Sequence, residues 1–237
     1  LKTGGQLPVG QRLECHVDLV RLTDKVEKAL GPKTQDLPGK RVGRGYAANI
    51  TGYGRPSSAS EGFVGMDLDG SALIRIGVSD LGAGQASAAC QVVADELGLP
   101  LERISILNSD SATTPLVGYT ASSRQTMMSG RALENASQII RDSLVEAAAE
   151  MLEARREDLI LDDGWVRVSS APETAVPIAE TVIRAQEKGL PIAATGSFKT
   201  PELDYPNADQ YNGFAGWTDY TWGVHAAEVV VDEATGE

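Results

Sequence analysis

The chain has 237 residues, which is enough to bury a sizeable core in one or two domains. Its formal net charge of -12 makes nucleic acid and anionic membrane surfaces unfavourable partners, and no apolar run approaches the length of a membrane span. Two distant cysteines, Cys15 and Cys90, exclude an intrinsic four-cysteine cluster and a disulfide framework, and they predict a reducing compartment, the cytoplasm.

The N-terminal part combines a loop, a helix and the first strands. Helical spacing runs over residues 13–30, until Gly31 and Pro32 stop it. A surface connection at 38–41 precedes a strand over 43–50 and a loop over 51–58. The next two strands, 63–67 and 72–78, flank the hairpin signal Leu68-Asp69-Gly70-Ser71.

A glycine turn, Gly82-Ala83-Gly84-Gln85, joins the strand ending at Val78 to an alanine-rich helix that stops at Gly98. Such a turn leaves several N–H groups unpaired at a helix N-terminus, where the helix dipole also favours an anion. The pattern therefore predicts an anion site. Taken alone it is also typical of a turn that only lets strand and helix pack closely, and it is neither a P-loop nor a full dinucleotide fingerprint.

A second, similar segment follows a strand over 103–107 and a polar loop over 108–119. It reads Thr120-Ala121-Ser122-Ser123-Arg124-Gln125 and precedes a long helical pattern. Ser122 and Ser123 can cap the helix or donate to a ligand oxygen, and Arg124 offers a forked cation suited to phosphate. The alternative is a plain N-cap with an exposed arginine. One buried helix face is predicted from the apolar spacing of Leu133, Ala136, Ile140, Leu144, Ala147 and Met151.

The remaining pattern continues the alternation of hairpins and helices. It predicts a hairpin over 158–168, a helix over 177–188, a strand over 192–198, an aromatic loop over 199–219 and a strand over 222–231. These elements predict an α+β fold with a mixed, mainly antiparallel sheet packed with helices. Residues 232–236 form a hairpin turn without a returning strand, which favours a piece of a longer polypeptide over a frayed natural C-terminus.

The remaining candidate residues do not form a metal site or a hydrolytic active site. Cys15 and His16 are adjacent and cannot both face one metal ion, so we expect no metal ligands in the chain. His225 lies in a predicted strand, and no Ser-His-acid set can be assembled with either histidine.

Four blocks in order, together with the tail, carry a resemblance. They are Gly77 to Gln85, Val93 to Ile104, Asp110 to Pro115, Ala121 to Ala132 and the tail from Val224 to Gly236. This combination resembles the molybdopterin-binding, catalytic large subunit of the xanthine dehydrogenase and aldehyde oxidase family of molybdenum hydroxylases. The match spans roughly residues 40 to 237. It implies a linker and helix over 1–40 and a molybdenum-cofactor-binding domain, truncated at its C-terminus, over 41–237.

The resemblance also implies a reaction and its parts. Such enzymes insert a water-derived oxygen into an N-heterocycle or an aldehyde. The cofactor is molybdopterin with molybdenum, with cytosine dinucleotide as the expected form, and electrons leave through iron–sulfur clusters and FAD on other domains or subunits. The implied cofactor-binding residues are Gly82, Ala83, Gly84, Gln85, Ala121, Ser122, Ser123, Arg124 and Gln125.

Two departures from the family pattern matter. Many relatives have Gly-Gln-Gly in the first turn, so Ala83 stands where they have Gln, and Gln85 follows two residues later. The catalytic glutamate, in a Gly-Glu-Pro-like context, is expected beyond Glu237, and its carboxylate acts as the base. The isolated chain is therefore expected to be inactive and to bind cofactor poorly. Two alternatives remain: a non-catalytic scaffold or subunit-association domain, and a simple phosphate or nucleotide binder.

Overall fold

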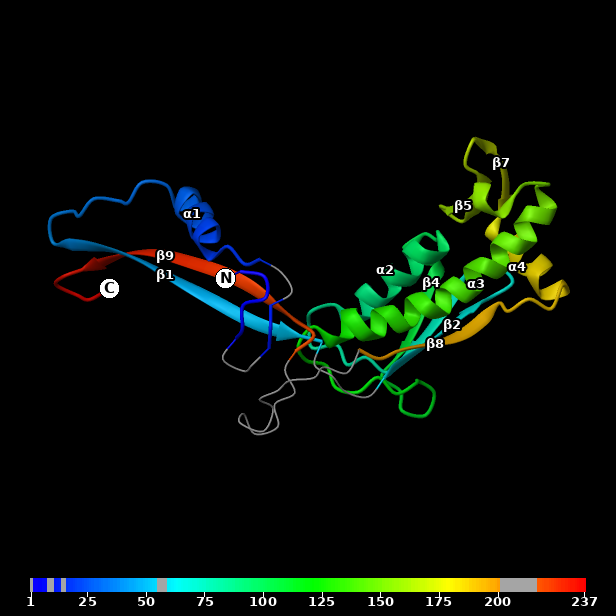
Figure 1. The fold of residues 1–237 in the computed structure, drawn as a ribbon, viewed down its shortest axis with the longest axis horizontal. Coiled ribbons are helices and arrows are strands. Elements are labelled where there is room, and N and C mark those ends of the chain that lie inside the picture. Colours follow the sequence, from blue (N-terminus) through cyan, green and yellow to red (C-terminus); the bar gives the residue numbers. More distant parts are fainter. Residues whose placement is uncertain (1, 8–10, 14–15, 55–58, 201–216) are drawn as a thin grey trace. The chain divides into compact units, whose positions relative to one another are not determined.

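The computed structural model describes the chain apart from residues 1, 8–10, 14–15, 55–58 and 201–216 (Figure 1). It contains two compact units: one combines residues 1–56 with 202–237, and the other spans 57–201. This division by compactness differs from the predicted division at residues 40 and 41, which separates a linker from a cofactor domain. The latter stays a prediction.

A four-stranded mixed sheet forms the centre of the 57–201 unit, with strand order β4-β3-β2-β8. Strands β2 (Ser60–Met66) and β3 (Ala72–Ile76) form an antiparallel hairpin, and β8 (Ala193–Phe198) pairs antiparallel with β2. Strand β4 (Ile104–Asn108) instead runs parallel to β3. Because parallel strands end at the same edge of a sheet, the loops that follow β3 and β4 leave the sheet together.

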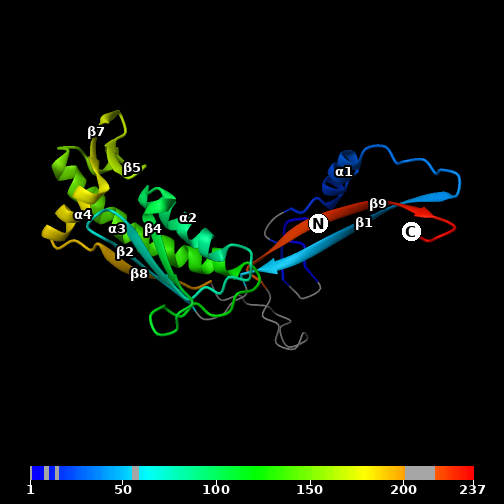
Figure 2. The same cartoon turned by 180° about the vertical axis from the view of Figure 1, so that it is seen from behind.

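Two helices cover one face of this sheet (Figures 1 and 2). Helix α2 (Gln85–Leu97) and the short 3-10 turn η1 (Leu101–Arg103) form the crossover from β3 to β4, and α3 (Gly130–Met151) lies beside α2. A Cβ atom at Gly196 would overlap the backbone oxygen of Ala132, so a glycine at this position lets α3 approach β8 closely. The side chains buried between sheet and helices include Val64, Ile74, Ile76, Val93, Leu97, Leu133, Ile140 and Leu144.

A smaller antiparallel sheet and a helix pack at the C-terminal end of α3 (Figure 1). The sheet has the order β5-β6-β7, with β5 (Leu159–Asp162), β6 (Trp165–Val168) and β7 (Ala171–Pro177). Helix α4 (Ile178–Glu187) follows β7 directly. Its buried side chains belong to the same core as those of the larger sheet, so the unit has one continuous hydrophobic core.

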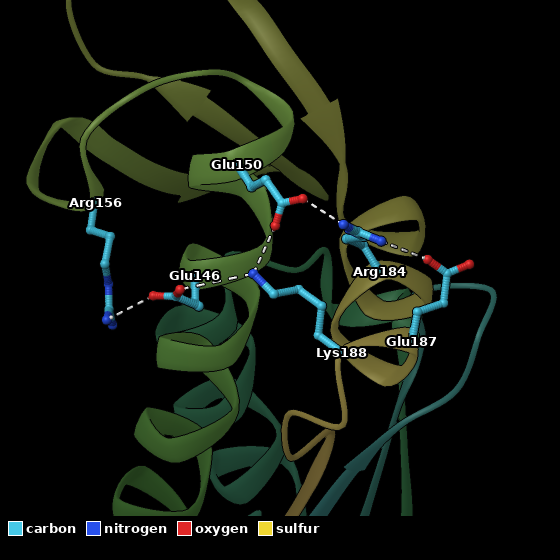
Figure 3. A network of polar contacts seen from close by, with 6 residues as sticks. All are labelled: Glu146, Glu150, Arg156, Arg184, Glu187 and Lys188. Atoms are coloured by element: carbon cyan, nitrogen blue, oxygen red, sulfur yellow. Dashed lines mark hydrogen bonds and ion pairs between the residues drawn. The ribbon is translucent and has the colours of Figure 1, made fainter.

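An ion-pair network joins α3, α4 and the 3-10 turn η3 (Arg156–Asp158) (Figure 3). Glu150 lies between two cations, Arg184 of α4 and Lys188 directly after it, with its Oε2 2.8 Å from Nζ of Lys188 and its Oε1 bonded to Arg184. The hydrogen bonds from Lys188 and Arg184 lower the pKa of the Glu150 carboxyl to about 2. Because all these side chains are partly exposed, water and salt weaken each ion pair, and the buried side chains of α4 contribute more to its packing than this network does.

The other unit is built on a long antiparallel strand pair. Strand β1 (Lys40–Tyr53) pairs with β9 (Asp219–Asp232), and helix α1 (Leu19–Leu30) packs on β9. Arg44 donates to Glu228 across the pair and to the backbone oxygen of Gly31 just after α1, which ties helix and strands together. Among the residues that the structure describes, no helix is long and apolar enough to cross a membrane.

The predicted α+β class is confirmed, with helices on a mixed, mainly antiparallel sheet. The helix predicted over 13–30 is wrong at its start: it begins at Leu19, because the side chain of Asp18 accepts from the N–H of Arg21 and caps it there. The prediction of Met151 on the buried face of α3 is also wrong, since it lies in the last turn and is 37% exposed. Most of the predicted aromatic loop over 199–219 falls outside the described residues.

Candidate functional site

The two loops singled out in the sequence meet at one edge of the central sheet. The hydroxyl of Thr120, in the loop after β4, donates to the backbone oxygen of Ser79, in the loop after β3, at 2.9 Å. Gln85 and Gln125, one from each predicted segment, line the same small pocket between the beginnings of α2 and α3. The parallel pairing of β3 and β4 is the cause of this meeting.

The first turn has open space but no free donors at its glycines. Gly82 and Gly84 have φ values of 94° and 78°, and a Cβ built on either would have no atom within 4 Å. The N–H groups of Gly82 and Gly84 donate to Oδ1 of Asp80 at 2.9 and 3.2 Å, and that of Ala86 donates to its Oδ2 at 3.4 Å. The expectation that both turn glycines offer unpaired N–H groups is therefore wrong, because a carboxylate of the chain already accepts from them.

Sequence reasoning missed Asp80. The hydrogen bond from the N–H of Gly82, supported by those of Ala86 and Gly84, lowers the pKa of the Asp80 carboxyl and keeps it charged. An aspartate two residues before a turn glycine is a readable signal, since its side chain commonly accepts from the backbone two residues on. Asp80 thus supplies at the N-terminus of α2 the negative charge that the helix dipole favours.

The second segment keeps its donors open. Ser122 and Ser123 both have a φ of 53°, in the left-handed region that non-glycine residues rarely adopt. Within the described part of the chain, neither their hydroxyls nor their N–H groups have a hydrogen-bond partner. Of the two roles left open for these serines, the helix cap is not formed: the helix begins at Arg124 through the π-helical segment η2 (Gln125–Ser129), and no side chain caps it.

Arg124 does not present its guanidinium to solvent. Its side chain is 1% exposed, donates to the backbone oxygen of Val117 and lies over the ring of Tyr119 at 5.6 Å. Burial lowers the pKa of the guanidinium, although it stays charged in the physiological range. The expectation of an accessible forked cation is wrong: Arg124 holds the loop that leads into Ser122 and Ser123, and its binding role stays a prediction.

The other predicted residues differ in accessibility. Ala83 and Ala121 are exposed, and Oε1 of the half-buried Gln85 accepts from the N–H of Leu81 at 3.3 Å. Gln125 is buried, and its amide bonds to Thr120 and Ser129 rather than to solvent. Direct contact with a ligand is therefore geometrically open to the two alanines and the two serines, whereas Gln125 serves the loop itself.

The donors and the open space fit one edge of a large polar cofactor with an anionic group. Two adjacent serines of the second segment offer hydroxyl and amide donors, and two glycines of the first turn leave room for a ligand to approach the backbone. The residues that could hold such a group are Gly82, Ala83, Gly84, Ala121, Ser122 and Ser123.

The model of the molybdopterin cofactor-binding domain family matches residues 17–237. The chain belongs to this family. The predicted resemblance to molybdenum hydroxylases is thereby confirmed. The matched family is one of molybdopterin cofactor-binding domains.

Curated relatives include two bacterial proteins. The nicotine 6-hydroxylase large subunit of Paenarthrobacter nicotinovorans is 34% identical over 197 residues, which cover 76% of this chain and 23% of that protein. A probable xanthine dehydrogenase subunit of Bacillus subtilis is 30% identical over 200 residues, with coverage of 82% and 25%. The chain therefore spans about a quarter of the length of these relatives, which are oxidoreductases.

A solved structure shares the fold. The aldehyde oxidoreductase of Desulfovibrio gigas superposes with a TM-score of 0.67 over all of this chain and 24% of that protein, at 23% sequence identity. This likeness concerns the architecture alone, and it agrees with the α+β arrangement of the described elements.

Proposed function

We propose that this chain is the cofactor-binding portion of a molybdenum hydroxylase that inserts a water-derived oxygen into an N-heterocycle or an aldehyde. The observation that carries the proposal is the meeting of the Gly82–Gln85 turn and the Ala121–Gln125 segment at one sheet edge, within a chain that matches the cofactor-domain family. Of the two substrate classes, the N-heterocycle has support from a relative, the nicotine 6-hydroxylase large subunit.

In this proposal, the residues of the chain bind the cofactor and orient it. The molybdenum cofactor, when bound, supplies the two-electron oxidation and the transfer of the oxygen. Ser122 and Ser123 donate to an anionic oxygen of the cofactor, with a cytosine dinucleotide as the proposed form, because their donors are the open ones. The turn at Gly82 and Gly84 gives the ligand close access to the backbone, while Asp80 keeps that turn in shape.

The remaining parts of the machinery lie elsewhere in the proposal. Iron–sulfur and FAD subunits accept the electrons, in keeping with relatives that are themselves named as subunits. No Gly-Glu-Pro segment occurs in this sequence, so we infer that the isolated chain lacks the base and is inactive. The cysteine content supports a cytoplasmic location.

Two observations weigh against a simple phosphate binder. The N–H groups of Gly82, Gly84 and Ala86 already donate to Asp80, and the guanidinium of Arg124 is buried. Such a binder would nevertheless gain thermal stability from a mononucleotide, since a ligand that binds only the folded state raises Tm. We expect no such rise for the isolated chain.

The decisive test is chemical analysis of the complete subunit. Metal analysis and mass spectrometry of the released cofactor should find molybdenum and a pterin dinucleotide in equal amounts. Oxidation of nicotine, quinoline, hypoxanthine or an aldehyde, followed with an artificial electron acceptor, should occur with the assembled enzyme and not with residues 1–237. A complete subunit without pterin would refute the proposal, and turnover by the isolated chain would refute the inactivity.

A further inference from the structure

Thr120 links the two loops through both functions of one hydroxyl. Its Oγ1 donates to the backbone oxygen of Ser79 at 2.9 Å and accepts from Nε2 of Gln125 at 3.0 Å. A hydroxyl can donate and accept at once, which no apolar side chain of the same shape can do. Ser79 directly precedes Asp80, and Thr120 directly precedes Ala121, so the bridge joins the two chain segments just before the Gly82–Gln85 turn and the Ala121–Gln125 segment.

Gln125 is held in one orientation by the same network. Its Oε1 accepts from the hydroxyl of Ser129 at 2.6 Å, and its Nε2 also donates to the backbone oxygen of Tyr119 at 3.3 Å. Gln125 and Ser129 are 5% and 2% exposed. Reversing this amide would bring its oxygen against the backbone oxygen of Tyr119, where neither atom can donate, and this is costly for a buried side chain.

We propose that Thr120 is a positioning residue, which couples the order of the Gly82–Gln85 turn to that of the Ala121–Gln125 segment and thereby sets cofactor retention. The inference rests on the proposed function for its cofactor part. The two loops leave separate strands, and each would have to be ordered when the cofactor binds. A bridge formed in advance removes that entropic cost, which is the usual benefit of preorganisation.

The test compares three variants of the complete subunit. Thr120→Val removes the hydroxyl and keeps the shape, and Thr120→Ser keeps the hydroxyl. Thr181→Val is the matched control, because the hydroxyl of Thr181 also donates to a backbone oxygen, that of Ile178, but does so within α4, away from both loops. The measurements are pterin and molybdenum content per subunit, the melting temperature, and amide hydrogen exchange of residues 81–86.

Thr120→Val should lower the cofactor content severalfold. It should also speed amide exchange in residues 81–86 about tenfold, because the net free energy of one hydrogen bond corresponds to about a tenfold change in the equilibrium for local opening. Thr120→Ser should keep both the cofactor content and the exchange rate near the wild-type values. Thr181→Val should change neither of them, even where it lowers the melting temperature as much as Thr120→Val does. Exchange in residues 81–86 that is unchanged by Thr120→Val, or is changed equally by Thr181→Val, overturns the inference. A wild-type subunit without pterin would instead refute the proposed function, and the exchange data would still decide the coupling of the loops.

Discussion

Oδ1 of Asp80 lies 2.9 Å from the backbone nitrogen of Gly82, at a position where the N-terminus of α2 would otherwise attract an external anion. The N–H groups of both turn glycines therefore already have an acceptor, whereas the donors of Ser122 and Ser123 remain open within the described chain. The two segments therefore differ in role: the Gly82–Gln85 turn leaves open space for a ligand at the backbone, and Ser122 and Ser123 offer hydrogen-bond donors.

Removing the Asp80 carboxylate should open the first turn. In Asp80→Ala the N–H groups of Gly82 and Gly84 lose their acceptor, so we expect about tenfold faster amide exchange there. The freed donors should also bind inorganic phosphate, which then raises the melting temperature of the variant but not of the wild type. Asp69→Ala is the control, because Asp69 accepts from Ser71 in a similar turn outside the site. Equal responses of the two variants would contradict the assignment.

Two helix-flanking glycines should respond differently to alanine. Gly84 and Gly98 both have positive φ, so each substitution costs about 1 to 2 kcal/mol in backbone strain. A Cβ at Gly84 meets open space, whereas one at Gly98 would overlap the backbone of Leu161 and cost about 2 kcal/mol more. Urea unfolding should show this order. In the complete subunit, Gly84→Ala should lower molybdenum content more than Gly98→Ala does, and the reverse order would argue against a ligand above the first turn.

Arg124→Ala should destabilise the fold rather than only weaken ligand binding. The variant leaves the carbonyl of Val117 without its charged donor and removes the contact with Tyr119, which together cost about 2 kcal/mol. Chemical denaturation measures the loss. A stability within about 0.5 kcal/mol of the wild type, as for an exposed residue, would show that the guanidinium is accessible in solution.

Acid should weaken the packing of α4 on α3 through Glu150. The pKa of its carboxyl is about 2 in the folded chain against an ordinary value of 4.5, so its stabilising effect is fully present above about pH 4.5. That effect is lost as the pH falls from 4.5 toward 2. Glu150→Gln should flatten the decline in stability over this window. Glu173→Gln, which alters an exposed carboxylate of β7 with no ion pair in the described chain, should leave the decline unchanged.

Much of the fold was predictable because its signals are local. The turn at Leu68 to Ser71, the end of α2 at Gly98 and the apolar face of α3 each depend on residues a few positions apart. The predicted start of α1 is too early because the apolar positions Leu13 and Val17 continue the helical spacing. Both are buried, but they precede the Asp18 cap.

The site was predictable only in outline. That the loops of Gly82 and Ser122 approach each other followed from the resemblance, not from spacing alone. The bond from Gly82 to Asp80 could be read from their spacing, whereas the further bonds from Gly84 and Ala86 depend on how the Asp80 side chain is placed. The burial of Arg124 depends on how the loop around Val117 folds over it, and no local sequence pattern predicts that loop conformation.

The parallel pairing of β3 and β4, the single parallel strand pair in the described chain, also indicates where a label or an insertion can be placed. Strand β3 begins at the edge opposite the Gly82–Gln85 turn and the Ala121–Gln125 segment, directly after the hairpin turn, and Leu68 at the tip of that turn is 50% exposed. A fluorescent label or a short peptide insertion at Leu68 should therefore be tolerated. Such a label would report unfolding of the central sheet while leaving the two loops at the other edge unmodified.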